Sequence, residues 1–374
     1  MSLGLVQEFV GKIESKHQDY FLLFDEEFKA TAESLFDTEK LLFYPRHELK
    51  NTSGLQRARI YLRFITKLRK LGADTAIDLE GDSVSSMLTM LSGAQTKVGP
   101  FGCPRSQRYT HISKPKRSAQ QSEFYRYRNV LATVIELEES APRYGQLKLP
   151  LLDNRFNSKL VENGLTQRTN LVVCHTGASK VRKLWPREHW IELIKLLQGV
   201  GVTPVLVGTG TIEADNNIAI TCALQQPIVN LTNKLSLLEL ALLTSRSQFF
   251  IGNDSGPMHL ACSLGIEGIG IFGPTYECLW GPLLPNVVAL RSEACPLTCN
   301  NGHACDSNIS CLAKLTPKMV FQEFRNRYPR FTEPKHQRVP APPILATELQ
   351  PTPVDGQRDS VHSSDRLAPH SAAL

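Results

Sequence analysis

The feature that most restricts the fold is an alternation of short apolar runs with helical patterns in the second half of the chain. The helical pattern over 187–198, for example, places Trp190, Ile194 and Leu197 on one face. The runs are LVVC (171–174), TPVLVG (203–208), FFIG (249–252) and GIGIFG (268–273). Strands that alternate with helices form a parallel sheet covered on both faces. Such sheets bind ligands at the carboxyl ends of their strands, so we expect the loops after these runs to meet there: 175–186, 208–213 and 252–257.

The first half of the chain shows a less regular form of the same pattern. It predicts helices over 2–16, 55–71 and 82–92 and strands over 19–24, 40–43 and 73–79. This half opens with a helix, whereas a parallel sheet usually opens with a strand. Residues 140–167 have the composition of a connection between two domains. We therefore predict domains over 1–155 and 156–330, followed by a disordered, proline-rich tail over 331–374.

Composition places the chain among ordinary soluble proteins with room for two domains, since 41% of its 374 residues are hydrophobic and 21% are charged. No run approaches the roughly 18 apolar residues of a membrane span, and no signal-peptide pattern follows Met1. We therefore expect a cytoplasmic protein. The net charge of +6 favours anionic partners only weakly. No nucleic-acid partner is expected.

The stretch IGNDSGPMHLA (251–261) carries the clearest local signal for a ligand. Asp254 and Ser255 are typical helix N-caps, and Pro257 suits the first helical turn, so a purely structural interpretation explains part of the stretch. A phosphate site is the alternative. Gly256 would let a ligand approach the backbone, and the free N–H groups and the dipole of the helix attract anions.

This stretch and the following LGIEGIGIFGPT (264–275) resemble the signature of glycosyltransferase family 9, the lipopolysaccharide heptosyltransferases. Further blocks resemble the family in the same order: 73–102, 175–193 (HTGASKVRKLWPREHWIEL) and 295–320. The resemblance implies an α/β fold with parallel sheets in two facing Rossmann-like domains (GT-B type). It implies transfer of a heptose from ADP-heptose to the lipopolysaccharide inner core, by inverting displacement without a cofactor or a metal.

The resemblance also assigns roles to residues of the second domain. The donor pyrophosphate would be held by Asp254, Ser255, Gly256, Pro257, Met258 and His259. Thr176 and Ser179 would lie near the phosphates, Lys183 would contact them, and Glu213 would bind the nucleoside hydroxyls. Structural alternatives stay open at three of these positions. His259 could be a packed residue at a helix start, Lys183 a solvated surface lysine, and Glu213 an acid in the first turn of a helix.

The start of the chain departs from the family's pattern. Family members begin with a strand and a Gly-Asp turn whose aspartate is the proposed catalytic base, and Met1 falls about where that turn would stand. We therefore expect the first domain to be incomplete at its N-terminus. Either the true start codon lies upstream of Met1, or the protein is an inactive relative of the family. No catalytic base is assigned, since Asp25 and Asp78 end predicted strands but do not match it. A non-catalytic nucleotide-sugar binder, and a transferase for another nucleotide sugar, are the alternatives.

Basic residues of the first half suggest how an acidic acceptor would be recognised. Arg105, Arg108, Lys116 and Arg117 are candidates for acceptor binding. The basic helix over 57–70 could recruit an anionic membrane surface, which implies a peripheral protein on the inner face of the bacterial inner membrane. The alternative is an ordinary solvated face.

One cysteine cluster follows the second domain's last predicted strand: Cys295, Cys299, Cys305 and Cys311. Its spacing lacks the close C-x2-C pairs of strong zinc sites. A structural zinc site, reduced packing cysteines and a disulfide all stay open.

Overall fold

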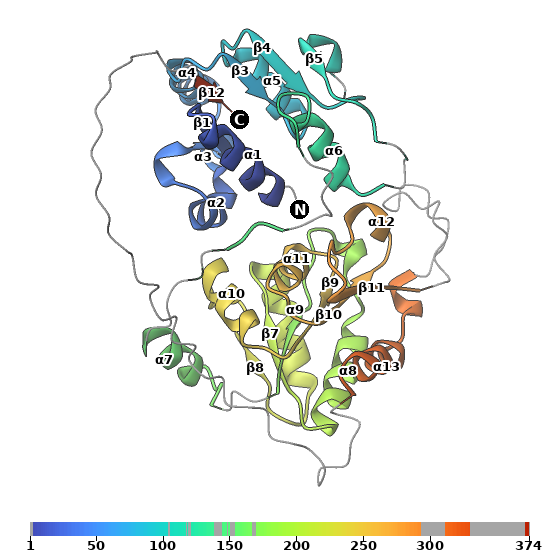
Figure 1. The fold of residues 1–374 in the computed structure, drawn as a ribbon. Coiled ribbons are helices and arrows are strands. Elements are labelled where there is room, and N and C mark those ends of the chain that lie inside the picture. The colour runs from blue at the N-terminus through green and yellow to red at the C-terminus, as the bar shows by residue number, and fades with distance from the viewer. Residues whose placement is uncertain are drawn as a thin grey trace, which may run out of the picture.

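The computed structural model contains two α/β units, each built on a six-stranded parallel sheet (Figure 1). It describes residues 3–103, 105–116, 118, 121–137, 144–147, 149, 154–166, 170–292, 311–329 and 371–373. The predicted α/β fold with two parallel sheets is confirmed.

The first sheet has the strand order β2-β1-β12-β3-β4-β5. Its strands are β1 (Asp19–Asp25), β2 (Leu41–Tyr44), β3 (Thr75–Ile77), β4 (Thr96–Gly99), β5 (His111–Ile112) and β12 (Ser371–Ala373). Its helices are α1 (Leu3–Ser15), α2 (Lys29–Leu35), α3 (Arg46–Lys50), α4 (Gly54–Lys70), α5 (Ser83–Leu91) and α6 (Glu123–Leu131).

Helices cover both faces of this sheet, and each face has its own apolar cluster. On one face, α1 and α6 bury Phe9 and Phe124 against Leu22 of β1 and Val98 of β4. On the other face, α4 and α5 contribute to a cluster of Leu42, Tyr44, Phe64, Ile65, Leu68 and Leu88. The basic helix predicted from the sequence therefore buries only one apolar stripe, and its charged residues lie on the outside.

The second sheet has the strand order β11-β10-β9-β6-β7-β8. Its strands are β6 (Leu171–His175), β7 (Thr203–Val207), β8 (Val229–Asn230), β9 (Phe249–Asn253), β10 (Gly268–Phe272) and β11 (Val287–Arg291). Its helices are α7 (Asn154–Glu162), α8 (Arg187–Gly199), α9 (Thr211–Ala223), α10 (Leu237–Ser245), α11 (Gly256–Ser263), α12 (Glu277–Trp280) and α13 (Pro317–Arg327).

Alternating side chains of the buried strands supply the cores on the two faces of this sheet. In β6, Val172 and Cys174 pack in the cluster that contains residues of α8 and α13, whereas Leu171 and Val173 pack in the cluster that contains residues of α10 and α11. Because both faces are covered, the central strands are apolar throughout, as the LVVC and FFIG runs indicate.

The predicted connection over 140–167 is only partly irregular. Residues 154–162 form α7, because Phe156 and Leu160, spaced by one helical turn, bury on the second sheet's core. Residues 145–147 lie beside the first unit, where the Gln146 N–H donates to Gln7 Oε1 over 2.8 Å, whereas Tyr144 packs on the second unit's core. The two units also contact each other directly, through α2 with α10 and through a 3.3 Å hydrogen bond from Ser122 Oγ to the Leu279 carbonyl.

The proline-rich tail was predicted to be disordered throughout, and this is wrong for its last residues. Ser371–Ala373 form β12, which pairs in parallel with Asp19–Phe21 of β1 and with Thr75–Ala76 of β3. An extended segment there satisfies backbone groups of two strands at once, which composition does not reveal. Residues 330–370 lie outside the described part of the chain, and the predicted incompleteness of the first domain stays a prediction.

A cavity of about 470 Å³ continues the line of β12 between β1 and β3. Leu22, Leu23 and Phe24 of β1 line it on one side, and Ala76 and Ile77 of β3 on the other. Residues of α1 and α5, on opposite faces of the sheet, also line it.

Candidate functional site

The junction of β9 and α11 forms the centre of the candidate site. Asn253 ends β9 fully buried, and its side-chain amide donates to the carbonyls of Thr176 (2.8 Å) and Gly177 (3.2 Å). Its Oδ1 accepts from the Trp185 N–H over 3.4 Å. One asparagine thus holds together two of the three loops that the sequence predicted to meet, 175–186 and 252–257.

The N-terminus of α11 carries no side-chain cap, contrary to the structural interpretation of Asp254 and Ser255. Ser255 occupies the N-cap position with an extended backbone but accepts no hydrogen bond from the helix. Gly256 is exposed and has open space where a Cβ would stand. Pro257 has no N–H and the Met258 N–H donates to the Ser255 carbonyl over 3.2 Å, so it is the Gly256 N–H that is available to an anion in this first turn.

Lys183 lies beside this helix end rather than on a solvated surface. Its Nζ is 2.7 Å from Asp254 Oδ2, and only 16% and 8% of the two side chains are exposed. Trp185 anchors the segment because its buried indole N–H donates to the Leu315 carbonyl over 2.8 Å. The Lys-x-Trp-Pro spacing thus places one cation at the turn.

Glu213 lies in the first turn of α9, and its carboxylate rests against two glycines. A Cβ on Gly177 would stand 1.9 Å from Glu213 Oε1, and one on Gly208 would stand 2.5 Å from Oε2. Oε2 accepts from the Thr209 N–H over 2.8 Å and lies 3.4 Å from His175 Nε2. Partial burial opposes ionisation, but these partners outweigh it and hold the pKa of Glu213 below its usual value.

The two predicted hydroxyl residues after β6 differ in their surroundings. Thr176 is buried, and its hydroxyl donates to Asn217 Oδ1 of α9 over 2.5 Å. Asn217 in turn donates to Thr232 Oγ1 over 2.7 Å. The Thr176 side chain therefore joins α9 to the sheet, whereas Ser179 is exposed on the loop.

His259 and its neighbours in α11 are packed more tightly than Gly256. Met258 is fully buried, and its sulfur would stand 2.3 Å from a Cβ on Gly270. His259 Nδ1 is 2.8 Å from the Tyr144 hydroxyl, which itself accepts from the Leu283 N–H. Burial lowers the pKa of His259 to about 4, so its ring is neutral near pH 7. Pro257 occupies the first turn, as predicted.

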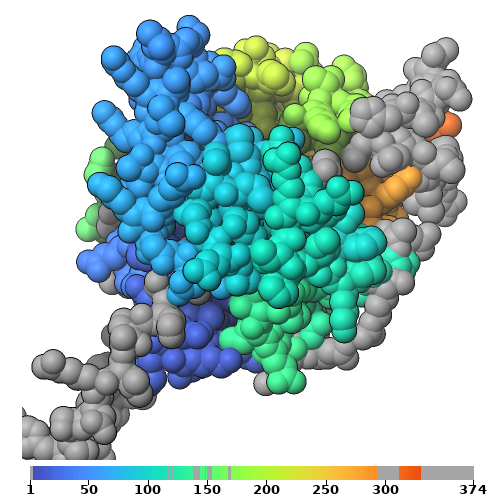
Figure 2. All heavy atoms as spheres, turned by 90° about the horizontal axis from the view of Figure 1, so that it is seen from above, coloured from blue at the N-terminus to red at the C-terminus, as the bar shows by residue number. Residues whose placement is uncertain are grey.

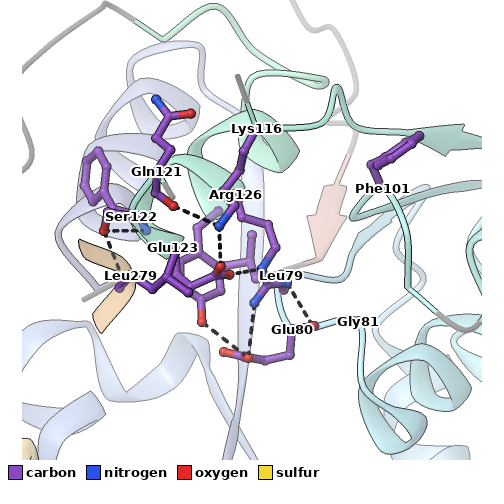
Figure 3. Close-up of polar contacts among 12 residues, drawn as sticks. Leu79, Glu80, Gly81, Phe101, Lys116, Gln121, Ser122, Glu123, Arg126 and Leu279 are labelled. Carbon is purple, nitrogen blue, oxygen red and sulfur yellow. Dashed lines mark hydrogen bonds and ion pairs between the residues drawn. The ribbon is translucent and has the colours of Figure 1, made fainter. Parts of the chain in front are cut away.

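Lys116, one of the candidate acceptor residues, has internal partners in the first unit (Figure 3). Lys116 Nζ lies 2.6 Å from Glu123 Oε1 and donates to the Gln121 carbonyl over 2.8 Å. Arg126 binds the other oxygen of Glu123 at 2.6 Å and donates to the carbonyls of Leu79 and Glu80. These bonds fix α6 to the loop after β3, a structural role that the sequence did not indicate.

The other basic candidates are spread around this network. Arg105 donates to the Ser83 carbonyl over 2.7 Å at the start of α5, and Arg108 is exposed. Arg117 lies outside the described residues. The arrangement therefore brings the predicted donor-binding residues together, but it does not gather the four acceptor candidates into one site.

Two strand-end carboxylates line the 470 Å³ cavity, and both are engaged by protein groups. Asp78 is buried and accepts from the Tyr109 hydroxyl (2.6 Å) and the Gly81 N–H (2.8 Å). Asp25 is paired with Arg46. We assign neither as a catalytic base.

No metal-binding group of His, Cys, Asp or Glu occurs among the residues that the structure describes. Of the cysteine cluster, Cys295, Cys299 and Cys305 lie outside those residues, and Cys311 packs against the second unit's core. No helix in the described part of the chain is both long and apolar enough to cross a membrane.

Sequence reasoning missed His175, the last residue of β6. It is buried, with Ser255 Oγ 3.0 Å from its Nδ1 and Glu213 on its other nitrogen. The available signal was its place in the quoted block HTGAS, directly before the turn.

Two Rossmann-like units with parallel sheets, the second with an uncapped helix end and a lysine at its strand ends, define a protein of the GT-B fold class. The family model of glycosyltransferase family 9 (heptosyltransferase) matches residues 61–306. The chain belongs to this family.

Relatives and solved structures agree with this assignment. Lipopolysaccharide heptosyltransferase 1 of Campylobacter coli is 24% identical over 73% of this chain and 80% of its own length. Lipopolysaccharide heptosyltransferase 1 of Pseudomonas aeruginosa is 26% identical over 62% of this chain and 63% of its own length. The ADP-heptose lipopolysaccharide heptosyltransferase II of Escherichia coli shares the fold with a TM-score of 0.66 at 17% identity, covering 88% of this chain and 97% of that one.

Proposed function

We propose that this protein transfers a heptose from ADP-heptose to the inner core of lipopolysaccharide. The uncapped N-terminus of α11, with the Lys183–Asp254 pair beside it, is the observation that carries the proposal. Family membership and the likeness to heptosyltransferases support it. An Escherichia coli heptosyltransferase has been solved with ADP; it has the same fold at a TM-score of 0.63 and 20% identity, over 87% of this chain and 97% of that one.

The donor would be held at two ends. The Gly256 N–H, the Ser255 hydroxyl and Lys183 would bind the diphosphate. The Glu213 carboxylate can accept two hydrogen bonds from the ribose diol. Because these hydrogen-bond donors and the lysine would hold the diphosphate, we propose no cofactor.

The reaction would be a direct displacement with inversion. The acceptor hydroxyl oxygen attacks the anomeric carbon opposite the diphosphate, and the bond from that carbon to the phosphate oxygen breaks. Its electron pair leaves with ADP, where Lys183 and the helix dipole stabilise the developing charge. The acceptor proton must pass to a base, and we assign none among the described residues.

We also propose that the protein is cytoplasmic and works at the inner face of the inner membrane. The outer face of α4 is basic and carries two exposed apolar side chains, Leu55 (83% exposed) and Leu62 (64%). Basic and apolar groups together suit an anionic lipid surface that also presents the acceptor. Arg108 is an exposed candidate for the acceptor itself.

Calorimetry with ADP, UDP and GDP in the presence of a chelator tests the donor assignment. We expect ADP to bind most tightly, and removal of divalent cations to leave its affinity unchanged. Preference for UDP, or strict magnesium dependence, would contradict the proposal and favour another nucleotide-sugar transferase.

A second measurement separates an enzyme from a binder. ADP release from ADP-heptose should require a heptose-accepting core lipid. Binding of ADP-heptose without acceptor-dependent release would favour the non-catalytic alternative.

A further inference from the structure

One imidazole lies between the two proposed ends of the donor site. His175 Nδ1 is 3.0 Å from the Ser255 hydroxyl at the start of α11, and Nε2 is 3.4 Å from the Glu213 carboxylate of α9. We propose that His175 is a positioning residue that aims both groups at the donor, so that the nucleoside and diphosphate ends are bound cooperatively. The proposal rests on the donor site described above.

The backbone around His175 is rigid. His175 ends β6 and is paired with Val207 of β7 on one side and with Gly252 of β9 on the other. A Cβ on Gly252 would stand 3.1 Å from the His175 Cβ, so the glycine leaves room for the histidine side chain. A buried ring held by two neighbouring strands can fix its partners more firmly than a loop residue could.

Each partner depends on His175 for its orientation. Ser255 Oγ has only one other partner among the described residues, the Asn253 carbonyl at 2.9 Å, and makes no bond within its own helix. The Glu213 carboxylate has the Thr209 N–H, but that bond fixes only Oε2, which is also the oxygen nearest to His175. Loss of the ring would therefore free a rotation in both side chains.

Two amide substitutions of His175 can each keep one of its two contacts and remove the other. In His175→Asn the side-chain amide reaches about as far as Nδ1 and can keep the Ser255 contact, but it falls short of Glu213. In His175→Gln the longer amide can reach the Nε2 position and keep the Glu213 contact, but it loses Ser255. Both are polar and of similar size, so each controls for the other.

The readouts are affinities for ADP, 2′-deoxy-ADP and inorganic pyrophosphate, measured by calorimetry on the full chain. The wild-type protein should prefer ADP over 2′-deoxy-ADP by about 10- to 100-fold, the effect of one hydrogen bond to a charged group. Glu213→Gln and His175→Asn should lose that preference, whereas His175→Gln should keep it. Ser255→Ala and His175→Gln should weaken pyrophosphate binding by a similar factor, whereas His175→Asn should not.

The preference for ADP over 2′-deoxy-ADP is a ratio of two affinities measured on one preparation, so partial unfolding of a variant does not change this ratio. His111→Asn, at an exposed position in the first unit, is the control and should behave as the wild type does. If the wild type binds no ADP, the proposed function itself fails. If ADP binds and Glu213→Gln loses the preference, but the two His175 variants behave alike, the positioning role of His175 is overturned.

Discussion

At the scale of single residues, the site depends on pairs that the structure forms from distant parts of the chain. Lys183 is the clearest case, because its partner Asp254 is 71 positions away and almost fully buried. A lysine in such a pair contributes to stability and stays close to where a diphosphate would bind. The effects of its removal should therefore appear in both properties.

We predict that Lys183→Ala weakens ADP binding by about 10- to 100-fold, as loss of a charge-assisted contact does. It should also lower the thermal midpoint, because the buried Asp254 carboxylate loses its counter-ion. The double variant Lys183→Ala/Asp254→Asn should regain stability but not affinity. Calorimetry and thermal unfolding measure both, with Lys180→Ala at a nearby exposed position as the control. Unchanged ADP affinity would show that Lys183 is only structural.

At the scale of elements, α11 differs from helices that are closed by their own side chains. α10 begins with a complete capping box between Ser236 and Glu239, whereas the Ser255 side chain of α11 turns away to His175. An uncapped helix start costs stability unless water or a ligand supplies the acceptors. The first turn of α11 is therefore suited to a ligand.

We predict that Gly256→Ala separates ligand binding from folding. The new methyl group meets no protein atom within 4 Å, and alanine favours a helix by up to about 1 kcal/mol over glycine. The thermal midpoint should hold or rise, while ADP affinity falls because the methyl group stands where the diphosphate would approach. Gly199→Ala in α8, which also meets no atom within 4 Å, should leave affinity unchanged. Wild-type affinity in Gly256→Ala would place the diphosphate elsewhere.

At the scale of the whole molecule, α4 lies on the far side of the first unit from the second sheet (Figure 1). The face seen from above is formed mainly by the first unit, with the α4 region in the lighter blue (Figure 2). If the acceptor is lipid-linked, this face can rest on a membrane while the donor site stays on the other unit. Binding should then depend on the charge of this one surface.

We predict that Arg59→Glu/Arg63→Glu/Lys70→Glu in α4 abolishes most binding to vesicles containing phosphatidylglycerol, since each basic group near an anionic surface contributes about 1 kcal/mol. Co-sedimentation measures this, with neutral phosphatidylcholine vesicles for comparison. Lys195→Glu/Lys314→Glu/Lys318→Glu changes the net charge equally at exposed positions of the second unit and should leave binding intact. Equal loss in both triple variants would indicate attraction by net charge alone.

Local sequence patterns alone determined many of the helices and strands of this protein, and its family. Periodicity alone predicted the helix that runs over Leu3–Ser15 and the strand over Asp19–Asp25 to within a few residues, because burial of one face imposes the pattern directly. The motif blocks indicated the family and the turn between β9 and α11. These are properties of neighbouring residues, which a linear sequence displays.

Only the tertiary structure decided what the polar side chains do. Ser255 was a candidate N-cap from the sequence, but its side chain contacts His175, 80 positions earlier. Thr176 is buried, with its hydroxyl bonded to Asn217 of α9, and Lys116 pairs with Glu123. β12 likewise forms only because two distant strands leave a place between them. A hydrogen bond depends on position and direction in space, and the partners of these groups are brought near only when the sheets assemble, so no local pattern could identify them.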